Sequence, residues 1–302
     1  MSWQLPFATW LAEREDSSPR TIASYQGALG IFAAWFEQAY GRSFDPAQLT
    51  TRDVRAYRHE LQQIRGLSAS TVNVALAALR AVARWAIASG ALASNPAAAI
   101  AFVELQPAQP RWMSRGELSR LLAEFERKIN DARARGATVR AEQAVRDLAA
   151  VSLMGGAGLR IAEVCSLDLA DIELHPRSGR VTVRQGKGRV QRTVPLGLQV
   201  REALTDWLSL RGQQPGPLFA GQRGNRLGVR QLERSFAEAA RRGSLIGFTP
   251  HSLRHTFVKT VTTHSGLATA QQLAGHRRIQ TTARYAAPGE HELAEAVEGV
   301  LL

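Results

Sequence analysis

The feature that most limits how this 302-residue chain can fold is a proline-containing break about a third of the way along it. Residues 104–111 (ELQPAQPR) hold two prolines and follow neither helical nor strand periodicity, which is typical of a linker between domains. A chain of this length is long enough for two domains that each have their own core. The sequence therefore predicts one domain over residues 1–103 and a second over residues 112–302.

The first domain is predicted to contain helices only. Apolar residues recur at helical spacing, and residues that commonly begin or end helices flank each segment. Ser18 and Pro19, for example, form a helix start with proline at the first helical position, and Gly41 forms the matching stop. The expected helices cover residues 3–14, 19–40, 51–66 and 68–90.

The second domain is predicted to be mainly helical with one small antiparallel sheet. Strand-like segments at residues 171–174, 180–184 and 190–196 are separated by glycine-containing turns. Helical segments flank this block, with an expected break at glycines 155, 156 and 158. Residues 127–146 are polar and alternately charged, which fits either a helical extension or a surface loop. The fold class we expect is a mainly α protein with a small antiparallel β-sheet, divided into two domains.

The net charge of +12 is concentrated in the second part of the chain. Residues 1–106 carry nine basic against eight acidic residues, whereas residues 107–302 carry 29 against 18. A GC-rich genome explains 35 arginines against three lysines, but not the excess of basic over acidic residues. Positive charge gathered on one domain is what a phosphate backbone attracts.

Other residue types exclude several classes of protein. Cys165 is the single cysteine, which rules out an internal disulfide and argues against a cysteine metal site. No apolar run approaches 18 residues, and no secretion signal is recognisable at the N-terminus. We therefore expect a cytoplasmic protein, associated with the nucleoid, that has no membrane partner.

Groups suited to phosphate chemistry gather near the C-terminus. His251 and Arg254 are three residues apart on a predicted helix, so both side chains can face one ligand. His276 follows, and Tyr285 is the only tyrosine after Tyr57. A tyrosine close to several cationic donors suggests nucleophilic attack on phosphorus.

Two earlier residues complete a pattern, namely Arg160, just after the glycine break, and Lys187, in the turn between two predicted strands. The order and spacing of the set resemble the signature of tyrosine recombinases, with Arg160, Lys187, His251, Arg254, His276 and Tyr285. The segments GLRIAE (158–163), GKG (186–188), HSLRHTF (251–257) and LAGH (273–276) are most similar to the Xer-like branch. The N-terminal helices resemble the core-binding domain of this family, so the resemblance covers nearly the whole chain.

The resemblance implies a covalent mechanism. Arg160 and Arg254 would bind the non-bridging oxygens of the scissile phosphate, because their planar guanidinium groups bind bidentately and stay charged. Tyr285 would attack the phosphorus, leaving a 3′-phosphotyrosine and a free 5′-hydroxyl. Lys187, at a loop tip, would protonate the leaving 5′-oxygen.

Three further residues would support this chemistry. His251 would assist proton transfer at Tyr285 or hold the phosphate, His276 would donate to a phosphate oxygen, and Glu163 would orient a neighbouring cation. We interpret His255 and the later His264 as structural. No ligand cluster demands a metal, and a phosphotyrosyl bond conserves the energy of the broken linkage, so no cofactor is expected.

The resemblance also implies partners. The two domains would clamp double-stranded DNA at recombination sites, and a tetramer would exchange strands through a Holliday junction. The tetramer would be homomeric or include a paralogue, and an accessory protein or translocase is a further candidate partner. Residues 290–302 predict a short helix that docks on its own domain or on a neighbouring protomer. Two alternatives stay open: relaxation of supercoils by a type IB topoisomerase, and site-specific DNA binding without cleavage.

Overall fold

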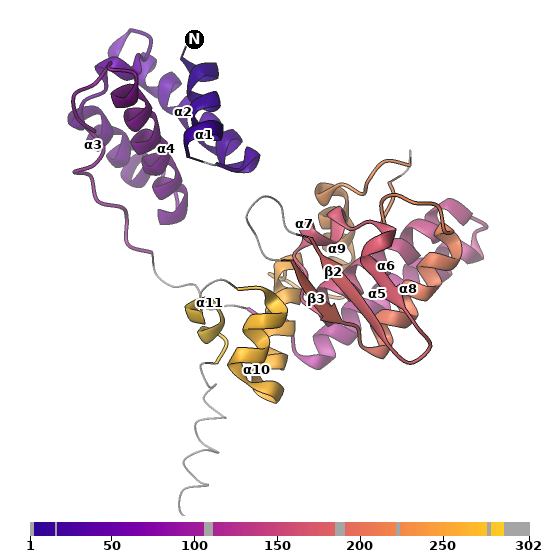
Figure 1. Cartoon of the computed structure of the whole chain (residues 1–302). Helices are drawn as coiled ribbons and strands as arrows, with labels where there is room; N and C mark the ends of the chain where they lie inside the picture. Colours follow the sequence, from indigo (N-terminus) through magenta and orange to yellow (C-terminus); the bar gives the residue numbers. More distant parts are fainter. Residues whose placement is uncertain are drawn as a thin grey trace, which may run out of the picture. The chain divides into compact units, whose positions relative to one another are not determined.

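The computed structural model describes residues 3–15, 17–105, 111–184, 191–221, 224–276 and 279–286. The chain forms two compact units, Met1–Ala108 and Gln109–Leu302, which are indigo to purple and magenta to yellow in Figure 1. The described residues are mainly helical with one small antiparallel sheet, so the predicted fold class is confirmed.

The first unit consists of helices, whose ends follow local signals. Its elements are α1 (Gln4–Arg14), α2 (Pro19–Tyr40), a 3-10 turn (Pro46–Gln48), α3 (Thr51–His59), a π turn (Glu60–Ile64) and α4 (Ala69–Ala88). The Ser18 hydroxyl accepts a hydrogen bond from the Thr21 amide, which caps α2, and Gly41 ends that helix with φ +68°.

Helix α4 lies in the core of this unit. It is apolar and long enough to cross a membrane by composition alone, but its residues Val72, Leu76, Leu79 and Val82 are buried against α1 and α2. We therefore interpret α4 as the core helix of a folded domain rather than as a membrane span.

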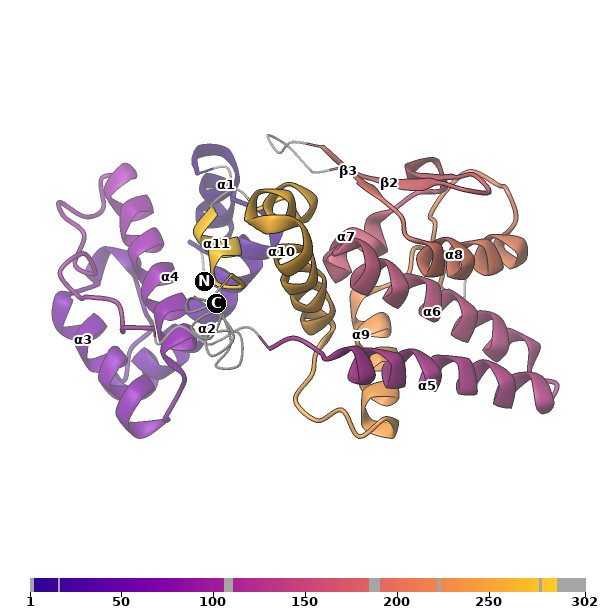
Figure 2. The same cartoon turned by 90° about the horizontal axis from the view of Figure 1, so that it is seen from below.

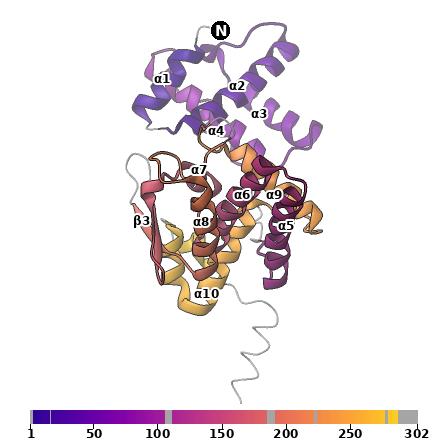
Figure 3. The same ribbon diagram turned by 90° about the vertical axis from the view of Figure 1, so that its right-hand side faces the viewer.

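The second unit packs a three-stranded antiparallel sheet against one side of its helices. Figures 2 and 3 show α6 and α8 between this sheet and α5. In chain order the elements are α5 (Arg115–Ala134), α6 (Thr138–Ala157), α7 (Ile161–Ser166), a 3-10 turn (Leu169–Asp171), β1 (Ile172–Leu174), β2 (Gly179–Val183), β3 (Arg192–Pro195), α8 (Leu198–Arg211), α9 (Val229–Arg242), α10 (Pro250–Ala274) and α11 (Ile279–Ala283). Strand β2 is central and pairs with both neighbours, with Val181 opposite Ile172 and Val194.

Helix α6 is the central helix of this unit and differs from the prediction at one point. It continues through Gly155 and Gly156, where we expected a break. A Cβ at Gly156 would lie 2.3 Å from the side chain of Val200, so the glycine there makes room for close packing rather than ending the helix. It ends at Gly158, whose φ of +67° suits glycine. Residues 127–146 form a helical extension rather than a loop, since α5 and α6 cover all but residues 135–137.

The last helices of the described chain are divided by glycines. Helix α10 is interrupted at Gly266, where φ is +82° and ψ is 167°, and it ends at Gly275. Figure 1 shows the short α11 beside α10, against which it packs. The predicted turn at residues 186–188 and the predicted helix at 290–302 lie outside the described residues.

Candidate active site

The candidate residues lie where helices begin or end, next to α7, α10 and α11. Arg160 precedes α7, two residues after the left-handed turn at Gly158. His251 and Arg254 lie in the first turns of α10, which Pro250 begins. His276 follows the helix stop at Gly275 and Tyr285 follows α11, so all five belong to the second unit.

Glu163 is the centre of the charged cluster. Its carboxylate accepts hydrogen bonds from Arg160 Nη1 at 2.7 Å and from Arg192 Nη2 at 2.7 Å. The backbone amide of Arg160 donates to it at 2.8 Å, and Nη1 of Arg254 lies 4.0 Å away. Burial alone would raise the pKa of Glu163, but the hydrogen bonds from Arg192 and the Arg160 amide outweigh it and lower the pKa to about 2. The carboxylate is therefore charged at neutral pH.

Arg254 is almost completely buried, with 1% of its surface exposed. It donates to the carbonyl oxygens of Gly158 at 2.5 Å and Ala274 at 2.7 Å, which ties the loop before α7 to the end of α10. Burial and the charge of Arg160 lower the pKa of Arg254 to about 10, so the side chain keeps its charge at neutral pH. Arg160 leaves 41% of its side chain exposed.

Arg192 is a member of this cluster that the sequence analysis missed. It lies on β3 and is 9% exposed. Its guanidinium contacts Glu163 and also donates to the Leu273 carbonyl at 3.1 Å. The available signal was the alternation of the strand, in which residues 192 and 194 are buried and 193 and 195 exposed. An arginine on the buried side of a strand requires a buried acidic partner.

Tyr285 is 5% exposed and packs with Phe257, Ala270 and Ala274. Burial raises the pKa of its hydroxyl, while the positive charges of Arg254 and its neighbour Arg284 oppose this shift. The hydroxyl is hydrogen-bonded to Nδ1 of a histidine on α10. A phenol with a raised pKa needs a proton acceptor before it can attack phosphorus.

That histidine is His255, which we had interpreted as structural. The structure places this ring at the Tyr285 hydroxyl, so His255 belongs to the candidate site by position. Its signal in the sequence was its position one helical turn after His251, on the same helix face. The two imidazole rings meet edge to face with centroids 4.3 Å apart.

The three histidines of the site have lowered pKa values. Burial and neighbouring positive charges lower the pKa of His255 and of His276 to about 4, and that of the more exposed His251 in the same direction. Nδ1 of His276 is hydrogen-bonded to the buried Thr282 hydroxyl at 2.8 Å. All three imidazoles are therefore mainly neutral at physiological pH.

One candidate residue remains outside this cluster. Lys187 lies outside the described residues, so its expected role stays a prediction. In the part of the chain that the structure describes, no group of three or more His, Cys, Asp or Glu side chains could hold a metal ion.

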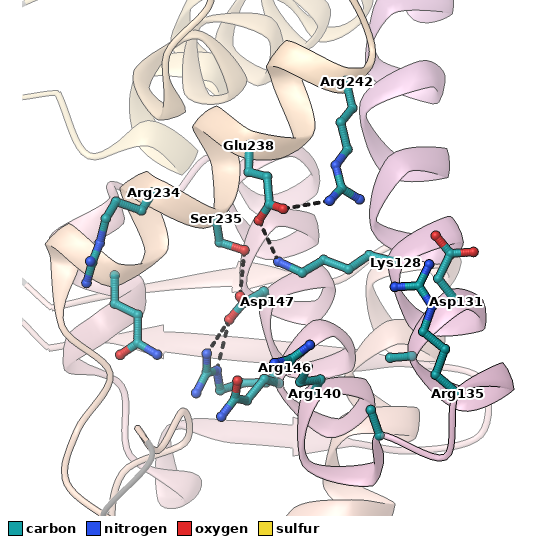
Figure 4. Close-up of a pocket in the computed structure, with 14 residues that line it drawn as sticks. Lys128, Asp131, Arg135, Arg140, Arg146, Asp147, Arg234, Ser235, Glu238 and Arg242 are labelled. Carbon is teal, nitrogen blue, oxygen red and sulfur yellow. Dashed lines mark hydrogen bonds and ion pairs between the residues drawn. The ribbon is translucent and has the colours of Figure 1, made fainter.

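A separate charged cavity of about 670 Å³ lies between α5, α6 and α9 (Figure 4). On one side Asp147 accepts from Arg146 at 2.6 Å and from Ser235 at 2.6 Å. On the other side, Glu238 accepts hydrogen bonds from Lys128 at 3.0 Å and from Arg242 at 2.7 Å. These contacts join three helices, and no lining residue belongs to the candidate set, so we interpret them as structural.

Comparison with known families matches almost the whole chain. Residues 111–292 match the phage integrase family, and residues 9–88 match its N-terminal SAM-like domain. The chain belongs to the phage integrase family. Within this family it is a site-specific tyrosine recombinase of the Xer-like branch, and the comparisons give no support to the topoisomerase or the non-cleaving alternative.

Individual relatives support the same assignment. Tyrosine recombinase XerC of Yersinia pestis is 32% identical over 287 residues, which cover 92% of this chain and 88% of that protein. XerC of Chromohalobacter salexigens is 35% identical, with 93% and 90% covered.

Two solved structures share the fold. XerH bound to a palindromic difH substrate has a TM-score of 0.73 at 19% identity, covering 97% of this chain and 84% of that one. A lambda integrase dimer bound to a COC′ core site has a TM-score of 0.69 at 20% identity, covering 94% of each chain.

Proposed function

We propose that this recombinase cleaves DNA through attack of Tyr285 on a phosphodiester held by Arg160 and Arg254. The observation that carries the proposal is the convergence of these arginines on one carboxylate, Glu163, in the unit that also holds Tyr285. A rigid cationic pair suits the charge that develops on the non-bridging oxygens during phosphoryl transfer. The products are a 3′-phosphotyrosine and a free 5′-hydroxyl.

The remaining residues receive roles that fit their positions. His251 is the exposed histidine of the cluster and contacts the phosphate, and His276 donates a hydrogen bond to a non-bridging oxygen. Lys187 protonates the leaving 5′-oxygen. Glu163 positions the arginines and does not contact DNA.

The proposed assembly is a tetramer on two DNA sites, which exchanges strands through a Holliday junction. Residues 1–103 act as the core-binding domain, 104–111 as the linker and 112–302 as the catalytic domain. Related proteins support this, because a lambda integrase tetramer has been solved on a Holliday junction and XerH on its difH substrate. The tetramer contains one kind of subunit or a paralogue as well, with an accessory protein or translocase as a further candidate, and it works in the cytoplasm at the nucleoid.

The test needs a cognate duplex, obtained by sequencing the DNA fragments that the protein binds in cells. A version of this duplex nicked next to the cleavage point releases a short fragment on cleavage and traps the covalent adduct. We expect the adduct with wild-type protein and none with Tyr285→Phe, whose DNA binding should be unchanged. An adduct that persists in Tyr285→Phe would refute the proposal, and recombinant product from intact duplexes would then distinguish strand exchange from relaxation.

A further inference from the structure

We propose that His255 is the general base that accepts the proton of the Tyr285 hydroxyl during cleavage and returns it during rejoining. The inference rests on the proposed function, since it requires Tyr285 to be the nucleophile. It assigns the proton transfer to His255 and leaves His251 to the phosphate.

The observation that supports this proposal is a direct contact between the base and the nucleophile. Nδ1 of His255 is hydrogen-bonded to the Tyr285 hydroxyl, and the two ring centroids are 5.2 Å apart. A general base has to lie within hydrogen-bond distance of the proton that it removes. Among the described side chains, His255 is the one hydrogen-bonded to this hydroxyl.

His251 occupies a different place in the cluster. Its ring contacts the ring of His255 rather than the tyrosine, and it is exposed, whereas His255 is half-buried. The α10 helix thus presents one histidine towards solvent and the other towards the nucleophile. This division fits an outer histidine that meets the phosphate and an inner one that serves the phenol.

The surroundings of His255 keep its ring neutral and ready to accept a proton. Burial and the charges of His251, Arg254 and Arg284 lower the pKa of His255 to about 4. A bound phosphodiester brings a negative charge to the site, which raises the pKa of a nearby imidazole. The base therefore becomes stronger when substrate is in place.

The proposed step balances in both directions. In the neutral ring the proton sits on Nε2, so Nδ1 accepts the hydrogen bond of the hydroxyl. As the oxygen of Tyr285 bonds to phosphorus, its proton moves to Nδ1 of His255, while the bond between phosphorus and the 5′-oxygen breaks and that oxygen is protonated by a separate acid. In rejoining, the 5′-hydroxyl attacks phosphorus and gives its proton back to the separate acid, which is now deprotonated, while the bond between phosphorus and the phenol oxygen breaks and His255 returns its proton to that oxygen.

The first experiment compares His255→Asn with wild type in single-turnover formation of the covalent adduct on the nicked duplex. Asparagine keeps a polar group near Nδ1 but cannot take a proton, so we expect the rate to fall about 10²–10⁴-fold with DNA binding unchanged. The matched control is His264→Asn on the same helix, whose exposed ring hydrogen-bonds the Thr260 carbonyl. It should cleave at the wild-type rate.

The pH dependence separates a base from a packing residue. Wild-type cleavage should be nearly level around neutral pH, because the base is already unprotonated there. In His255→Asn the remaining rate should rise in proportion to hydroxide concentration, since only solvent can then remove the proton. A His255→Asn protein that keeps the wild-type rate and pH profile overturns the proposal, and so does a uniform loss with an unchanged profile.

A second substrate tests which oxygen the base serves. Sulfur in place of the bridging 5′-oxygen gives a leaving group that departs without a proton. If His255 serves the nucleophile, the His255→Asn defect persists on this substrate; if sulfur restores the rate, His255 acts on the leaving group and the proposal is wrong. Failure of the proposed function is distinguishable, because it shows as an adduct in Tyr285→Phe whatever the behaviour of His255.

Discussion

Replacement of Glu163 by glutamine should destabilise the protein by an amount that depends on pH. The carboxylate accepts from Arg160 and Arg192 at 2.7 Å each and lies 4.0 Å from Arg254. Its pKa falls from an ordinary value of 4.5 to about 2. A difference of this size corresponds to roughly 3 kcal/mol of unfolding free energy at neutral pH. The glutamine amide carries no charge, so the variant lacks this contribution at every pH.

The pH range in which Glu163 stabilises the protein follows from the direction of its pKa shift. Because the pKa of Glu163 is lower in the folded than in the unfolded protein, the wild-type contribution is fully present above about pH 4.5 and is lost as the pH falls towards about 2. The difference between wild type and Glu163→Gln should therefore be roughly 3 kcal/mol near neutral pH and less than half of that at about pH 3. Urea unfolding of the two proteins, followed by circular dichroism at several pH values, measures this difference.

A matched control is Glu173→Gln on the sheet surface. Glu173 pairs with Arg180 at 2.6 Å, but both side chains are exposed, and exposed ion pairs contribute little to stability. Glu173→Gln should lower the free energy of unfolding clearly less than Glu163→Gln does. The reasoning would be refuted by a Glu163→Gln protein as stable as wild type at neutral pH, or by a difference that stays constant into the acid range.

Three further changes probe the surrounding structure. Asp147→Ala leaves the buried Arg146 without its partner and should lower the unfolding free energy by about 3–5 kcal/mol, as measured in urea; a loss below about 1 kcal/mol would contradict this. Gly158→Ala adds a Cβ 2.2 Å from the ring of Phe257 at a φ of +67°, so a drop in melting temperature together with weaker cleavage is expected. Arg192→Gln should slow adduct formation more than it weakens DNA binding in a gel-shift assay, because the side chain is buried behind the cluster.

Helix boundaries could be predicted from local sequence, because their causes are local. The cap at Ser18 and the stop at Gly41 involve hydrogen bonds over a few residues. The expected break at residues 155 and 156 was wrong for a tertiary reason. Gly156 is used there to admit the side chain of Val200 from α8, and sequence periodicity carries no record of that contact.

The candidate site divides in the same way. The resemblance to a known family located the residues of the proposed site, since it depends on order and local sequence. Arg192 and His255 were missed because their partners, Glu163 and Tyr285, lie 29 and 30 residues away in the chain. Only folding brings β3 to α7, and the end of α11 to α10.

The charge balance of the site explains why it holds a buried carboxylate among arginines. Arg160, Arg192 and Arg254 together with Glu163 leave an excess of two positive charges. A phosphodiester carries one negative charge, and the five-coordinate state formed by attack of a phenolate carries two. On the proposed mechanism the proton of Tyr285 stays in the site on His255, while the three arginines face the two negative charges of the phosphoryl group. The arginine cluster would then be matched more closely to the transition state than to the bound substrate, which is the condition for faster chemistry rather than tighter binding. The negative charge of Glu163 also offsets the mutual repulsion of the three arginines in the absence of DNA. On the proposed mechanism their guanidinium groups would then already be in place when negative charge develops on the phosphoryl oxygens.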